Sequence, residues 1–265
     1  MTNESSEGDV MASVLSAMTV RHHDDNLIIQ RPAATLKEIL EKIRSNKDQI
    51  RELDLKDMAA KKRKLQSSGG DLVGRVFQLN RTVLRLLLPG HDIGDVGAKS
   101  MGNMLRVNTT LQHLDLRGNK ITAEGVGVIT QALYGHETLV HLGLSSNKLG
   151  DDGARAVAEM LPYNSSLQCV GLARNEITEV GGKALLKAVL QNRTLFRIQL
   201  SNNDIPQEIL DKIRAAVVVN KFMQKKAQRD HEIEKNNAEH ALVQESVDQG
   251  TQDTSSDDDD ESLWI

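Results

Sequence analysis

Aromatic residues make up only 2% of the 265 residues, too few for the core of a conventional compact domain. A single cysteine, Cys169, excludes an intrachain disulfide and indicates a reducing compartment. No stretch approaches the roughly 18 consecutive apolar residues that a membrane-spanning helix needs. The early run from Val10 to Val20 is interrupted by hydroxyl side chains and follows acidic residues, so we predict no signal peptide there.

Motifs that carry enzyme chemistry are also missing. We find no phosphate-binding glycine loop, no HExxH, no GxSxG and no paired-cysteine metal motif. The scarcity of aromatics and the scattered basic residues disfavour nucleic-acid binding, which relies on stacking and on clustered cations. The sequence therefore predicts a protein that is not an enzyme, holds no cofactor and binds no nucleic acid.

What the chain has instead is a repeat with a period of 28 residues. Leucine, isoleucine or valine recurs at the third and fifth offsets of every copy, and the first four copies have glycine at the fourteenth. Asparagine occupies the eighth offset in four copies, and His91 takes that place in the first. A fixed period of this size is typical of a solenoid, in which no unit buries its apolar face alone. The copies begin at Val83, Leu111, Leu139, Leu167 and Leu195.

Each unit can be interpreted physically. The L-x-x-L-x-L stretch alternates as a strand does, so its leucines are buried and the residues between them face outward. The asparagine that follows can bond the backbone groups left unpaired at the turn, and stacked copies predict an asparagine ladder. The glycine lets the following helix approach its neighbours closely. We predict an α/β fold, a right-handed solenoid forming a horseshoe segment with about six parallel strands inside and helices outside.

Terminal helices should cap this solenoid. Thr35 and Glu38 form a capping box that starts the first one, and Pro206 opens the last. Both ends of the chain lack apolar periodicity, and residues 227–265 carry two basic and twelve acidic groups, a net charge of −10. The predicted parts are a disordered segment (1–32), the repeat domain (33–223) with cap helices (35–46 and from 206), a polar helical extension (224–247) and a disordered acidic tail (248–265).

The template L-x-x-L-x-L-x-x-N-x-I-x-x-x-G resembles the leucine-rich repeats of the ribonuclease-inhibitor type over roughly residues 36–223. This resemblance implies a horseshoe that works by protein binding. The segment from Leu36 to Leu55 is also similar to the start of the tropomodulin-type repeat domain, which implies actin-filament ends as a target. The Ran GTPase-activating protein shares the repeat type and an acidic tail, which implies a small GTPase, but we match no catalytic motif of it.

The residues that alternate with the buried leucines define the concave face of the predicted sheet. They form three columns, because adjacent strands lie about 4.8 Å apart. The first column is Glu52, Arg85, His113, His141, Cys169 and Arg197; the second is Asp54, Leu87, Asp115, Gly143, Gly171 and Gln199; the third is Lys56, Pro89, Arg117, Ser145, Ala173 and Ser201. On geometry alone we expect a partner to contact Arg85, Leu87, His113, Asp115, Arg117, His141 and Arg197.

Two features of this face have alternative interpretations. The small residues at its centre form either a seat for a partner's helix or extended chain, or an accommodation to curvature. The row of His113, His141 and Cys169 is either a soft-metal or thiol–imidazole site, or a set of solvated polar positions. Zinc normally takes a fourth ligand and supporting carboxylates, and only Asp115 is near, so solvated positions are favoured.

Signals outside the repeats concern regulation and location. Lys61–Lys64 is a basic cluster that is either a nuclear-import signal or a solvated loop. Ser255 and Ser256 precede four aspartates, a good substrate for an acidophilic kinase. The final Leu263, Trp264 and Ile265 form either a linear docking motif or a chance end.

The leading hypothesis is a non-enzymatic adaptor in the cytoplasm that binds a protein partner through its concave face. The alternative is a regulator of a cytoskeletal filament, as tropomodulin-like actin binding would imply, or of a small GTPase. Cytoskeletal association and the nucleus are the alternative locations. No membrane span is predicted.

Overall fold

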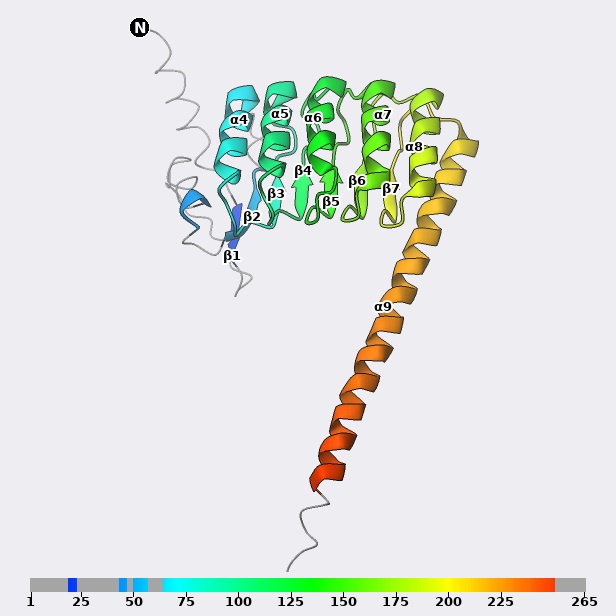
Figure 1. The fold of residues 1–265 in the computed structure, drawn as a ribbon. Helices are drawn as coiled ribbons and strands as arrows, with labels where there is room; N and C mark the ends of the chain where they lie inside the picture. The colour runs from blue at the N-terminus through cyan, green and yellow to red at the C-terminus, as the bar shows by residue number, and fades with distance from the viewer. Residues whose placement is uncertain (1–18, 23–42, 47–49, 57–63, 251–265) are drawn as a thin grey trace, which may run out of the picture. The chain divides into compact units, whose positions relative to one another are not determined.

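The computed structural model describes residues 19–22, 43–46, 50–56 and 64–250 (Figure 1). One sheet has its strands in sequence order; the second to the last run parallel to one another, and the first is antiparallel to the second. The predicted leucine-rich repeat solenoid of α/β class is confirmed. The strands are β1 (Thr19–His22), β2 (Ile50–Asp54), β3 (Arg85–Leu87), β4 (His113–Asp115), β5 (His141–Gly143), β6 (Cys169–Gly171) and β7 (Arg197–Gln199).

Helices connect successive strands and lie together on one side of the sheet (Figure 1). The α-helices between residues 66 and 191 pack in sequence order, each against the next, and cover the buried leucines. The residues up to Lys221 form one compact unit, and those from Phe222 onward form a second. The helices are α4 (Gln66–Phe77), α5 (Gly94–Leu105), α6 (Ala123–Leu133), α7 (Gly150–Met160), the 3₁₀ turn η1 (Leu161–Tyr163), α8 (Glu179–Gln191) and α9 (Gln207–Gly250).

The N-terminal prediction needs one correction. Residues 1–32 were expected to lack regular structure, but β1 pairs antiparallel with β2, with Thr19 opposite Asp54 and His22 opposite Ile50. The physical reason is the edge of the sheet: β2 would otherwise present a row of unpaired backbone groups. The other residues of 1–32 lie outside the described part of the chain.

The predicted helix over residues 35–46 is described only at its end. Residues 43–45 are helical, and Ile43 is buried. Asn46 ends the helix with φ 53°, and its side chain donates to the carbonyl oxygen of Leu79 (3.1 Å) and accepts from the backbone N–H of Arg81 (2.7 Å). The remainder of this predicted helix lies outside the described residues.

The C-terminal prediction also needs a correction. The cap helix and the polar extension form one continuous helix, α9, which ends at Gly250. The acidic tail was expected from residue 248, whereas 248–250 are still helical. Nothing in the sequence breaks the helix before Gly250, because no glycine or proline occurs between Pro206 and that residue.

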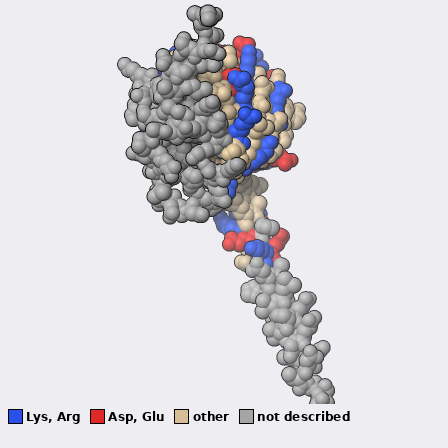
Figure 2. Space-filling model, turned by 90° about the vertical axis from the view of Figure 1, so that its left-hand side faces the viewer, with Lys and Arg blue, Asp and Glu red and all other residues tan. Residues whose placement is uncertain are grey.

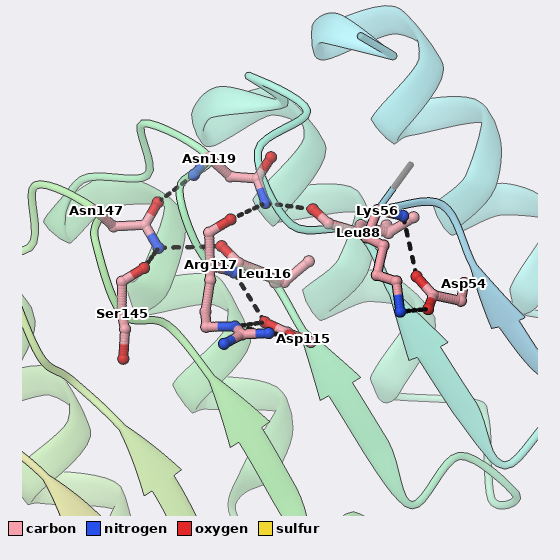
Figure 3. Close-up of polar contacts among 9 residues, drawn as sticks. All are labelled: Asp54, Lys56, Leu88, Asp115, Leu116, Arg117, Asn119, Ser145 and Asn147. Carbon is pink, nitrogen blue, oxygen red and sulfur yellow. Dashed lines mark hydrogen bonds and ion pairs between the residues drawn. The ribbon is translucent and has the colours of Figure 1, made fainter. Parts of the chain in front are cut away.

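The asparagine ladder forms as predicted and holds the strand ends in register. Asn119 accepts a hydrogen bond from the backbone N–H of His91 (2.9 Å) and donates to the carbonyl oxygen of Leu88 (2.7 Å). Asn147 makes the same bonds in the next repeat. It accepts from the backbone N–H of Asn119 (2.9 Å) and donates to the carbonyl oxygen of Leu116 (3.1 Å), as Figure 3 shows. Each amide thereby satisfies buried backbone groups of two repeats at once.

A second ladder lies at the other end of the strands. Asn108 donates to the carbonyl oxygens of Phe77 (2.8 Å) and Asn80 (3.1 Å) and accepts from the N–H of Leu111 (2.8 Å). His136 takes the asparagine's place in one repeat, where its Nδ1 accepts from the N–H of Leu139 (3.2 Å). The two ladders hold both ends of the repeat strands β3 to β7. The buried asparagines of the second are Asn80, Asn108, Asn164, Asn192 and Asn220.

Candidate functional site

The register of the sheet brings the predicted columns of the concave face together. Arg85 pairs with His113, His113 with His141, and the row continues through Cys169 to Arg197. The neighbouring row joins Leu87 and Asp115 to the two glycines of β5 and β6 and to Gln199. Six of the seven predicted contact residues lie on these strands, and Arg117 lies two residues beyond the end of β4.

Three cations of the concave face lie above buried carboxylates. The Arg117 guanidinium contacts Asp115 through Nε (2.8 Å) and a terminal nitrogen (2.7 Å), as Figure 3 shows. Lys56 pairs with Asp54 at 3.2 Å, and Arg85 with Glu52 at 2.9 Å.

The exposures of these pairs are strongly unequal. The cationic side chains are 57% (Arg117), 61% (Lys56) and 49% (Arg85) exposed, and their carboxylates are 7%, 6% and 10% exposed, respectively. The surface that a partner meets is therefore cationic, although each pair is neutral. Sequence reasoning listed these residues but could not tell which member of each pair lies outermost.

The two histidines of the first column stack on each other. Their ring centroids are 4.0 Å apart and the ring planes differ by 7°. Burial, together with the neighbouring His141 and Arg85, lowers the pKa of His113 to about 4. Burial also lowers the pKa of His141. Both rings are therefore neutral at neutral pH and form a flat patch between the arginines of β3 and β7.

Cys169 continues this row but is poorly suited to react. Burial raises the pKa of its thiol, and the nearby Arg197 only partly opposes this effect. A protonated thiol is a weak nucleophile and a weak metal ligand. Among the residues that the structure describes, no group of three or more histidine, cysteine or carboxylate side chains is placed to hold a metal ion.

The centre of the concave face is formed by three small, buried residues, Gly143, Gly171 and Ser145, which we call the central seat. A Cβ atom added to Gly171 would lie 3.0 Å from Ser145 Oγ and 3.7 Å from Gly143 Cα, so the hydroxyl lies beside bare backbone. Ser145 is 8% exposed, and its Oγ has no hydrogen-bond partner among the described residues. A buried hydroxyl without a partner is uncommon in proteins and calls for an explanation. Sequence analysis did not single out this hydroxyl.

Several predicted features outside the sheet lie beyond the described residues. They include most of the basic cluster (61–63), the two serines Ser255 and Ser256, and the terminal Leu263, Trp264 and Ile265. Lys64, the described member of the cluster, forms an ion pair with Asp92 (2.8 Å).

A further feature, not among the predictions from the sequence, lies on the helical side of the repeat unit. An open groove of about 470 Å³ runs between α7 and α8 and is lined in part by Tyr134 and Tyr163. Their rings stack with centroids 5.6 Å apart. The sequence feature that could have drawn attention to this groove is that Tyr134 and Tyr163 are the only two tyrosines of the chain.

Comparison with known proteins agrees with this geometry. A family model described as "Leucine Rich repeat" matches residues 107–129, 135–158 and 163–186. These three segments carry leucine-rich repeats. No curated protein sequence matches it significantly. None of the described helices combines the length and apolar character needed to cross a bilayer.

Among solved structures, the chain is similar to "Leiomodin-1 Actin-Binding Site 2 (ABS2)", with 16% identity and a TM-score of 0.47 over 76% of this chain and 99% of that chain. It is also similar to the tropomodulin C-terminal domain of Caenorhabditis elegans, with 11% identity and a TM-score of 0.48 over 73% and 96% of the two chains. Both similarities concern the fold.

Proposed function

We propose that this chain is a non-enzymatic adaptor that binds a protein partner through the concave face of its leucine-rich repeats. The observation that carries the proposal is the layer of exposed cations around the central seat, in which Lys56, Arg85 and Arg117 lie above nearly buried carboxylates. The seat adds no bulky side chain of its own, so a partner's main chain can lie across it. Cationic and flat aromatic groups surround the seat and offer further contacts.

A binding role fits the chemistry of the surface better than a reaction does. Cys169 is the strongest nucleophile in the row, but its raised pKa keeps it protonated near neutral pH. The histidines beside it are stacked on each other, and each ring is held neutral by burial. The regulator of a cytoskeletal filament and the regulator of a small GTPase both stay predictions from the sequence resemblance. The cytoplasmic location stays a prediction from the single cysteine.

Affinity capture with two glycine variants tests the proposal. Gly171→Gln fills the seat, and the nearest atom that its Cβ meets is the hydroxyl of a serine side chain. Gly127→Gln on α6 is the matched control, because a Cβ there meets nothing within 4 Å. We expect the wild type and Gly127→Gln to capture the same partners and Gly171→Gln to lose them, with thermal melts showing that both variants are folded. Equal capture by all three proteins would overturn the proposal.

A further inference from the structure

We propose that the segment bound on the concave face is an acidic, extended stretch of the partner. This inference rests on the proposed function and adds the chemistry of what is bound. It starts from the layering of charge, in which the carboxylates of Asp54 and Asp115 lie beneath the cations that they pair with. An approaching anion meets the cations first, because the carboxylates are nearly covered.

The buried carboxylates also prepare the arginines for binding. A guanidinium has five N–H donors in a rigid plane. Asp115 engages Nε and one terminal nitrogen of Arg117, and Glu52 engages Nε of Arg85, which leaves further donors on each side chain. Because one edge of each plane is held, less side-chain entropy is lost when the other edge binds a carboxylate.

Arg197 marks the far end of the first column. It is exposed on β7 and forms no ion pair with any described residue, unlike Arg85 on β3. Four strand spacings separate these two arginines, which is about 19 Å at about 4.8 Å per strand. An extended segment of about six residues has this length. Between the two arginines lies the neutral histidine stack, which adds no competing charge.

The seat beside this row suits the main chain of such a segment. Gly143, Gly171 and Ser145 are all small and buried, so no bulky side chain of the seat projects toward a bound peptide. A peptide crossing the strands would therefore place its backbone on the seat and direct its carboxylates toward the arginines on either side. Charge complementarity thus selects an acidic segment over a neutral or basic one.

Basic side chains are not confined to the concave face. In Figure 2, Lys and Arg (blue) gather on the visible surface of the repeat unit more than Asp and Glu (red) do. Any acidic probe could bind such a surface without specificity. The test therefore needs a control that removes an exposed cation elsewhere, and Lys187 on α8 provides one.

The experiment measures fluorescence anisotropy of a labelled peptide of alternating aspartate and serine added to the full chain. A peptide of alternating asparagine and serine is the neutral probe. We expect saturable binding of the acidic probe that weakens with salt, with Arg197→Gln reducing affinity about tenfold and Lys187→Gln leaving it unchanged. Arg197→Gln breaks no ion pair with a described residue, so its fold should be intact. A second variant, Asp115→Asn with Arg117→Gln, removes one pair without burying a lone charge and should also weaken binding.

The contrary outcomes are distinct. Absence of binding, equal binding of the neutral probe, or equal losses in Arg197→Gln and Lys187→Gln would overturn the inference. If Gly171→Gln still abolishes capture of a protein partner in that case, the adaptor function stands and only the acidic character of the segment is wrong. If Gly171→Gln captures the partner as well as wild type does, the adaptor function itself fails.

Discussion

His91 Nε2 lies 2.9 Å from the carbonyl oxygen of Leu55, the position that an asparagine amide takes in the later repeats. Its Nδ1 accepts a hydrogen bond from the backbone N–H of Leu65 (3.3 Å). One ring nitrogen thus donates and the other accepts, so the neutral imidazole offers one donor and one acceptor, as an asparagine amide does at this position in the other repeats. His91 departs from the sequence template but preserves the hydrogen-bond pattern.

This role predicts a loss of stability in acid. Burial holds the pKa of His91 below its ordinary value of 6.5, so the unfolded chain binds a proton at this residue more readily than the folded chain does. The free energy of unfolding should fall as the pH drops below 6.5, and the lowered pKa values of His113, His136 and His141 act in the same direction. Urea denaturation at about pH 7 and about pH 5 measures this. His91→Asn should remain folded and show a smaller pH effect; an unchanged pH effect would contradict the assignment.

The first ladder predicts a large cost for removing one amide. Asn147→Ala removes the acceptor of the N–H groups of Asn119 and Ile121 and the donor to Leu116, leaving buried backbone groups unpaired. We expect a loss of about 3 kcal/mol in the free energy of unfolding. Asn103→Ala on the exposed side of α5 is the control and should change it by less than about 0.5 kcal/mol. If chemical denaturation gave the same loss of stability for Asn147→Ala and Asn103→Ala, the ladder would contribute little to the stability of the fold.

The charge layering predicts non-additive mutations. Arg117→Gln leaves the buried carboxylate of Asp115 without its cation, and we expect a loss of about 2 kcal/mol in the free energy of unfolding. Asp115→Asn combined with Arg117→Gln should recover most of that loss, because no buried charge remains. Equilibrium denaturation of the wild type, both single variants and the double variant measures the coupling. Strictly additive changes would mean that the two side chains do not depend on each other.

Cys169 should react slowly with alkylating reagents. Burial raises its pKa above the ordinary value of 9.0, so little thiolate is present near neutral pH. The rate of modification by iodoacetamide, followed by mass spectrometry, should lie well below that of the urea-unfolded chain and rise only at alkaline pH. If the folded chain were modified as fast as the urea-unfolded chain, the thiol of Cys169 would be accessible and ionised, which would contradict this prediction.

Much of the architecture could be predicted because the 28-residue period fixes the register. Once Leu86 and Leu114 are aligned, Arg85 must lie beside His113, and the structure confirms this pairing. The strand β1 could not be predicted in the same way. Thr19–His22 lies outside the repeats, and its pairing with β2 depends on a sheet edge that only the folded molecule presents.

The details of the concave face depend on side-chain conformation, which a period does not determine. The columns predicted that Arg117, Ser145 and Asp115 share this face, but not that the carboxylate lies beneath the guanidinium. Nor could they reveal that the hydroxyl of Ser145 lacks a partner among the described residues. The template also missed that His91 and His136 replace asparagines in their ladders without breaking them.

Site-specific photo-crosslinking tests most directly whether partners bind the concave face. A photoreactive benzoylphenylalanine replaces Leu87, which lies on β3 in the second column, or Leu190, which is exposed on α8. With a captured partner bound to the full chain, we predict covalent crosslinks from position 87 and none from position 190. Crosslinks from position 190 alone would contradict the account, because they would place the partner on the helices.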